Sequence, residues 1–152
     1  ASENAIKLAQ DYSKIYSLNT NFIHQSALST IKSKYDLILC FELIEHLDNP
    51  EKLIENIAKT ISKKGTFVIS TLDRSIISYF QNILVAEDIL GLIEPGTHDF
   101  KKFLRPSEVI TMSEQYGFKV KQISGIHIDP VTFEATLSTE QFANYIIAFE
   151  KY

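Results

Sequence analysis

Apolar and polar positions along this chain follow two different periods, and the changes of period indicate where its elements lie. Residues 3–17 carry apolar side chains at helical spacing, behind Ser2, which can cap the first turn. Short apolar runs typical of buried strands follow at three places: 22–25, 35–41 and 66–71. Between the last two runs, Asn49 and Pro50 predict the start of an amphipathic helix. Strands and helices that alternate in this way indicate a parallel sheet with right-handed crossovers.

The second half of the chain departs from this alternation. Residues 76–93 are mostly apolar, and their uncharged part is too short to span a bilayer. We expect this segment to pack in a core, cover a site or lie against a membrane surface. A polar loop with His98 and Asp99 follows, and Pro106 predicts the start of another helix. Two strand-like segments end the chain: 118–128 and 145–149. Adjacent strands of this kind predict an antiparallel hairpin.

Composition bounds the size of the fold and the class of partner. A chain of 152 residues with 45% hydrophobic content can bury one core, so we expect a single domain. Its net charge of -4 and the lack of a basic run argue against nucleic acid as a partner. The single cysteine, Cys40, lies within an apolar strand, which excludes a structural disulfide and favours core packing. The first residue is Ala1 rather than methionine, which suggests processing or truncation.

The strongest candidate chemistry follows the apolar run at 35–41. Glu42, Glu45 and His46 come directly after it, and parallel sheets bind ligands at the carboxyl ends of their strands. The simpler interpretation is that both glutamates favour the first turn of a following helix and that His46 lies on the surface. On the local pattern alone, the simpler interpretation is favoured.

Longer motifs resemble a known family. The stretch Phe41-Glu42-Leu43-Ile44-Glu45-His46-Leu47-Asp48-Asn49-Pro50 resembles the middle of a class I S-adenosylmethionine-dependent methyltransferase. Lys64-Gly65-Thr66 and Ser70-Thr71-Leu72 extend that resemblance. The segments that resemble more specifically the ubiquinone-biosynthesis O-methyltransferases are 1–6, 96–106 and 125–132. This resemblance runs from end to end, and it implies methylation of phenolic hydroxyls on polyprenylated ubiquinone precursors, namely polyprenyl-hydroxyphenol and demethylubiquinol.

The resemblance implies an α/β fold: a Rossmann-like class I methyltransferase sheet flanked by helices, mostly parallel, with a C-terminal antiparallel hairpin. Members of the family begin with a strand, a Gly-rich loop for the cofactor and a second strand that ends in a ribose-binding acid. This chain has no such Gly-rich loop, because its five glycines form no G-x-G pair. Its first residue aligns just after the expected ribose-binding acid, so the second strand is not included either. We expect one partial domain over 1–152, with the first two strands absent and a helical insertion at about 74–105. The absent strands would lie between 22–25 and 35–41, so their loss would expose strand edges.

The resemblance also implies the cofactors and the roles of the first cluster. S-adenosylmethionine would supply the methyl group, and magnesium would be held by Glu42, Glu45 and His46. Phenol protons leave near pH 10, so a base or a metal must assist at neutral pH, and Glu45 and His46 are the catalytic candidates. Phe41 matches a family position that touches the cofactor through its backbone, although its side chain can simply pack.

The remaining expectations concern the substrate and the membrane. His98 and Asp99 either shape the quinol-head pocket or belong to a loop that Asp99 ties down by capping nearby amides. Residues 76–93 would let a polyprenyl substrate enter from a bilayer, although Glu87 and Asp88 argue against simple attraction to anionic lipid. The implied location is the cytoplasmic side of a bacterial membrane, or the matrix side of a mitochondrial one, beside other ubiquinone-biosynthesis proteins. The alternative is an inactive fragment that serves as a membrane-associated interaction module.

Overall fold

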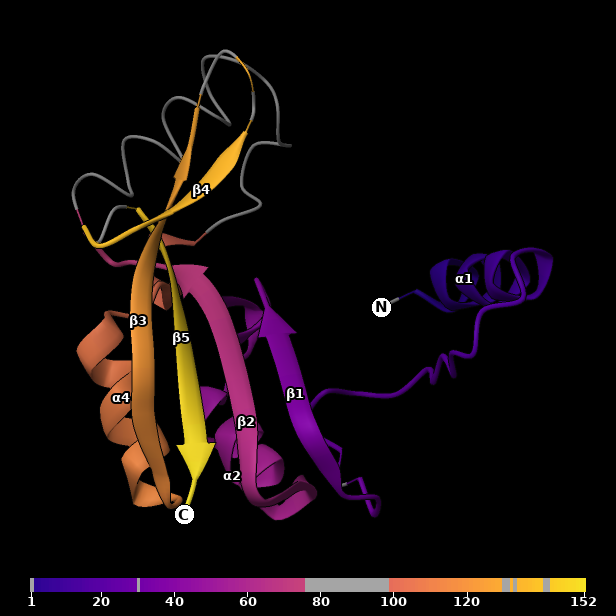
Figure 1. Ribbon diagram of the computed structural model, residues 1–152, viewed down its shortest axis with the longest axis horizontal. Helices are drawn as coiled ribbons and strands as arrows, with labels where there is room; N and C mark the ends of the chain where they lie inside the picture. Colours follow the sequence, from indigo (N-terminus) through magenta and orange to yellow (C-terminus); the bar gives the residue numbers. More distant parts are fainter. Residues whose placement is uncertain (1, 30, 76–98, 130–131, 133, 141–142) are drawn as a thin grey trace. The chain divides into compact units, whose positions relative to one another are not determined.

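The computed structural model describes the whole chain except residues 1, 30, 76–98, 130–131, 133 and 141–142 (Figure 1). The chain divides into two compact units, Ala1–Ile31 and Lys32–Tyr152. The predicted apolar segment 76–93 lies outside the described residues.

The first unit is built on helix α1, Glu3–Ile15, which confirms the predicted N-terminal helix. The side chain of Ser2 caps it as predicted, accepting a hydrogen bond from the amide of Ala5 at 3.2 Å. The predicted strand at 22–25 is wrong, because these residues are described and form no strand. The carbonyl of Phe22 instead accepts a hydrogen bond from the Gln10 side chain at 3.1 Å. A strand needs a hydrogen-bonded neighbour, and this segment pairs with none in the described sheet.

The second unit contains a five-stranded sheet in the order β1-β2-β5-β3-β4 (Figure 1). The strands are β1 (Tyr35–Phe41), β2 (Ile61–Leu72), β3 (Phe118–Ile128), β4 (Ala135–Ser138) and β5 (Asn144–Lys151). Strands β1 and β2 are parallel, as predicted for a crossover through the helix between them. The other three pairings are antiparallel, so the sheet of the described residues is mixed rather than mostly parallel as predicted. Strand β3 pairs with β5, which is the antiparallel pairing predicted for the last two long strands.

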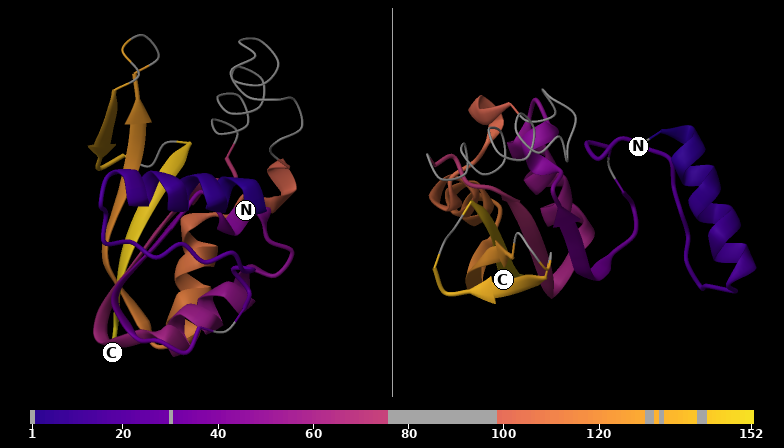
Figure 2. Two further views of the ribbon diagram at one scale, coloured as in Figure 1. Left: turned by 90° about the vertical axis from the view of Figure 1, so that its right-hand side faces the viewer. Right: turned by 90° about the horizontal axis from the view of Figure 1, so that it is seen from above.

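Two helices cover one face of this sheet, as Figures 1 and 2 show from different sides. They are α2 (Pro50–Thr60) and α4 (Pro106–Gln115), and both begin at the prolines that predicted them. The side chain of Asn49 caps α2 by accepting from the amide of Lys52 at 2.9 Å. Short 3-10 turns follow β1 and precede α4: η1 (Ile44–His46) and η3 (Phe100–Lys102). None of the helices that the structure describes is long and apolar enough to cross a membrane.

The core lies between the sheet and these helices. Phe67 of β2 stands at its centre, with its ring centroid 5.5 Å from that of Phe118 and 5.7 Å from that of Phe149. All three side chains are essentially inaccessible to solvent, as are Ile54 of α2 and Val109 of α4. Burial of these aromatic rings, together with the aliphatic side chains around them, stabilises the unit through the hydrophobic effect.

Strand β1 forms an edge of the sheet, and one of its faces carries exposed apolar side chains. Leu37, Leu39 and Phe41 alternate along it and are 55%, 55% and 51% exposed. In register they stand beside Thr66, Val68 and Ser70 of β2, respectively. An edge with exposed apolar side chains invites pairing with further chain segments, which is the liability that the sequence predicted.

Candidate functional site

The carboxyl edge of the parallel strands brings together the ends of β1 and β2. Phe41 pairs with Ser70, so Glu42, which directly follows β1, lies beside Thr71 of β2. Sequence analysis predicted that β1 would deliver carboxylates here. It did not predict that β2 would provide hydroxyl groups to bind them, because that depends on the register of the two strands.

Glu42 is bound to β2 through both its backbone and its side chain. Its amide donates to the carbonyl of Ser70 at 3.2 Å, and its carboxylate accepts from the Ser70 hydroxyl at 2.7 Å. Its φ of 46° lies in the left-handed region, which is uncommon for a residue with a side chain. Such backbone outliers concentrate at functional sites, so the sharp bend after β1 points to a ligand edge.

Glu45 lies in η1 and is only 3% exposed. The hydroxyl of Thr71, which is fully buried, donates to its Oε2 atom at 2.8 Å. Its Oε1 atom has no hydrogen-bond partner among the described residues. Burying a carboxylate with one oxygen unpaired costs free energy, and buried polar atoms in proteins are rarely left without a partner. Glu45 is therefore an exception that marks this edge of the sheet.

The structure does not assemble the predicted metal site. His46 follows Glu45 in η1, but its side chain is exposed whereas that of Glu45 is buried. Among the described residues, no group of three or more His, Cys, Asp or Glu side chains is arranged to hold a metal ion. Glu42 and Glu45 instead each accept a hydrogen bond from a hydroxyl of β2, and magnesium binding by Glu42, Glu45 and His46 stays a prediction.

Cys40 packs in the core next to this edge, as predicted. The side chain is 6% exposed. Burial, together with the negative charges of Glu45 and Glu42, raises the pKa of the Cys40 thiol to about 12. A thiol that keeps its proton at neutral pH is a poor nucleophile and a poor metal ligand.

Two further predicted residues are placed by the structure. Phe41 exposes half of its side chain at the end of β1, where a flat ligand can contact it, and its cofactor role stays a prediction. Asp99 caps η3, and its Oδ1 atom accepts from the amide of Lys101 at 3.0 Å. This is the loop-fixing role that the sequence left open. His98 lies outside the described residues, and a substrate contact by either residue stays a prediction.

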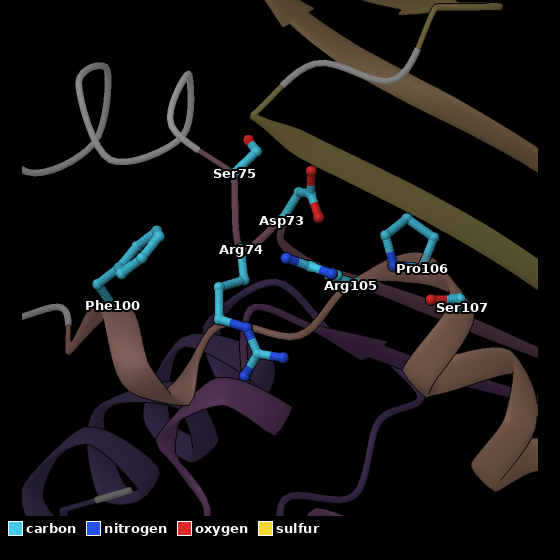
Figure 3. A pocket seen from close by; sticks show the side chains of 7 residues that line it. All are labelled: Asp73, Arg74, Ser75, Phe100, Arg105, Pro106 and Ser107. Carbon is cyan, nitrogen blue, oxygen red and sulfur yellow. The ribbon is translucent and has the colours of Figure 1, made fainter.

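A pocket of about 690 Å³ opens where β2 ends (Figure 3). Its lining residues are Asp73, Arg74, Ser75, Phe100, Arg105, Pro106 and Ser107. This pocket was not predicted from the sequence, although Asp73, Arg74 and Ser75 lie just beyond a predicted strand at the ligand-binding edge. Its volume is in the range that accommodates small organic ligands.

A family model described as a methyltransferase domain matches residues 2–123 of this chain. The chain belongs to this methyltransferase family. The methyltransferase domain is 35% identical to a ubiquinone biosynthesis O-methyltransferase of Coxiella burnetii over 150 residues. That match covers 97% of this chain and 64% of the relative, so the chain spans less than two thirds of its length.

Solved structures show the same fold. An S-adenosylmethionine-dependent methyltransferase of Clostridium acetobutylicum superposes with a TM-score of 0.69 at 10% identity, covering 99% of this methyltransferase domain and 72% of that chain. The magnesium protoporphyrin IX methyltransferase of Synechocystis, solved with bound SAH, gives a TM-score of 0.64 at 14% identity. That match covers 97% of this domain and 59% of the other chain. The predicted class I methyltransferase fold is therefore confirmed.

Proposed function

We propose that this chain is part of an S-adenosylmethionine-dependent O-methyltransferase that methylates phenolic hydroxyls of polyprenylated ubiquinone precursors. The observation that carries the proposal is the 35% identity to a ubiquinone biosynthesis O-methyltransferase across 97% of the chain. The methyltransferase fold and the bent carboxyl edge after β1 support the same conclusion. Polyprenyl-hydroxyphenol and demethylubiquinol are the proposed substrates.

The cofactor would supply a methyl group on a positively charged sulfur. Among the residues present, Phe41 is the candidate contact, because its half-exposed ring stands at the end of β1. The 152 residues contain no G-x-G loop to bind the methionine part of the cofactor. We therefore expect this chain alone to bind S-adenosylmethionine negligibly and to be inactive by itself.

The substrate's long apolar tail makes a membrane surface the natural place of action. We propose that the enzyme works at the cytoplasmic side of a bacterial membrane, or at the matrix side of a mitochondrial one, with residues 76–93 as the contact. Contacts with other ubiquinone-biosynthesis proteins belong to the same proposal. Liposome co-sedimentation of the complete gene product tests it, and lipid binding should weaken when Ile76, Ile77 and Phe80 are made polar. Wild-type protein that stays in the supernatant would contradict the membrane part of the proposal.

The enzymatic proposal is tested with the complete gene product and a catechol that carries a short prenyl chain. Mass spectrometry should show one added methyl group that depends on S-adenosylmethionine, and a catechol with both hydroxyls already methylated serves as the control. Calorimetry should show cofactor binding of micromolar class, about 8 kcal/mol, by the complete product. The 152-residue chain should give no saturable heat. If the complete product neither binds the cofactor nor transfers methyl groups, the chain is better explained as an interaction module.

A further inference from the structure

The pocket at the end of β2 has walls that are fixed to the sheet by hydrogen bonds. The amide of Asp73 donates to the carbonyl of Ala143 at 2.7 Å, next to β5. The amide of Leu104 donates to the carbonyl of Leu72 at 3.3 Å, and its own carbonyl accepts from the buried Tyr145 hydroxyl at 2.8 Å. The backbones that carry Asp73 and Arg105 are therefore held against the same end of the sheet.

The two arginines of this pocket have different surroundings. Arg74 forms an ion pair with Glu108, which neutralises its charge. The other oxygen of Glu108 accepts from the backbone amide of Arg105 at 2.7 Å and fixes the start of α4. Among the described side chains, Arg105 forms no ion pair, and its guanidinium acts on Asp73 through its charge. Figure 3 shows Asp73 and Arg105 next to each other at the pocket.

Asp73 is the carboxylate of this pocket. Partial burial raises the pKa of its carboxyl above the ordinary value, against a smaller opposite effect of a hydrogen bond with Ser75. The charged and titratable groups around it are Arg74 on its own segment, Arg105 and Glu108 at the start of α4, and Tyr145 on β5. Burial, together with nearby negative charges, raises the pKa of the Tyr145 hydroxyl far above its ordinary value, so Tyr145 stays neutral. Asp73 is thus the proton acceptor that this group of side chains offers.

The pocket and the proposed cofactor contact share one edge of the sheet. Phe41 pairs with Ser70, and Asp73 follows Ser70 by three positions, just beyond the end of β2. The ring of Phe100 lines the pocket on the side of η3 and provides an apolar surface for an aromatic substrate. An acid group, a cation and an aromatic ring are the three contacts that a phenol with a neighbouring oxygen can use.

Building on the proposed function, we propose that Asp73 accepts the proton of the phenol hydroxyl that is methylated, and that Arg105 binds the adjacent oxygen. The phenol O–H bond breaks and its proton passes to the Asp73 carboxylate. The oxygen then forms a bond to the methyl carbon, while the carbon–sulfur bond breaks and leaves its electron pair on sulfur. Asp73 finally releases its proton to water. The positive charge that the sulfonium carried before the reaction is thus carried by the released proton afterwards.

The test measures kcat/KM against pH for the complete gene product and its Asp73→Asn variant. With a prenylated catechol at pH 7, the kcat/KM of the variant should be lower than that of the wild type by about 100-fold or more, as expected for the removal of a general base. Its remaining rate should rise about tenfold for each pH unit, because only substrate already ionised reacts and phenols ionise near pH 10. Wild-type protein should be nearly flat over the same range. Asp36→Asn, at the other end of β1, is the matched control and should behave as wild type.

A nitro-substituted catechol, which is ionised at neutral pH, separates proton transfer from a merely structural role. Asp73→Asn should approach wild-type rates with this substrate, whereas Arg105→Met should stay impaired with both substrates, chiefly through a higher KM. An Asp73→Asn variant with the wild-type pH profile, or with equal losses on both catechols, overturns the assignment. If wild-type protein methylates neither catechol, it is the proposed function that fails, so the two failures are distinguishable.

Discussion

The hydrogen bond between Thr71 and Glu45 allows a sharp stability experiment. Thr71→Val replaces a buried hydroxyl with a methyl group of nearly the same volume, so apolar packing is retained. Glu45 is 3% exposed and its Oε1 atom is already unpaired, so the variant removes the only described partner of this carboxylate. A hydrogen bond to a charged group contributes about 1.5–3 kcal/mol, and the deep burial favours the upper half of that range. We expect the free energy of unfolding to fall by about 2–3 kcal/mol.

The measurement is urea unfolding of the complete gene product, followed by circular dichroism. Thr71→Ser keeps the hydroxyl, loses one methyl group and should cost only about 1 kcal/mol. The double variant Thr71→Val with Glu45→Met replaces both partners by apolar groups and should be more stable than Thr71→Val alone. A Thr71→Val variant within about 0.5 kcal/mol of wild type would refute the reasoning, because that is the range of an ordinary surface substitution.

Three further predictions rest on the described contacts. Burial raises the pKa of the Cys40 thiol from 9.0 to about 12, so the folded state keeps a proton that the unfolded chain loses. Stability should therefore fall as pH rises from about 9 towards 12, and Cys40→Ala should flatten that decline in urea titrations. Asn49→Ala removes the N-cap of α2 and should lower the free energy of unfolding by about 1 kcal/mol in the same assay. Asn49→Ser keeps a capping hydroxyl, so most of that stability should be retained. Leu39→Lys on the exposed face of β1 should reduce aggregation of the 152-residue chain in light scattering, and no change would argue that this face does not drive self-association.

Sequence reasoning located the elements well wherever a local signal was strong. The run from Tyr35 to Phe41 is a strand with the predicted bounds, and Pro50 and Pro106 begin helices as predicted. The prediction of a strand at 22–25 is wrong because a strand forms only when a neighbouring strand provides hydrogen-bond partners. None of the described strands pairs with this segment.

The site was predicted only in part, for a related reason. Glu42 and Glu45 could be assigned to the end of a strand from their positions in the chain. Their contacts with Ser70 and Thr71 depend on the register of two strands, which local patterns do not specify. The pocket around Asp73 and Arg105 joins residues 32 positions apart through the backbone bond of Leu104 with Leu72, so no single motif contains it.

The placement of Ser75 and Phe100 on the wall of one pocket has an evolutionary consequence. In the sequence, positions 76–98 lie between two segments that line the same pocket. We therefore expect that this stretch of sequence can be exchanged between relatives while the sheet and its carboxyl edge are kept. Relatives would then differ in acceptor preference by replacing this one segment while they keep the rest of the methyltransferase fold. Chimaeras joined at these two positions would be the direct way to change acceptor preference.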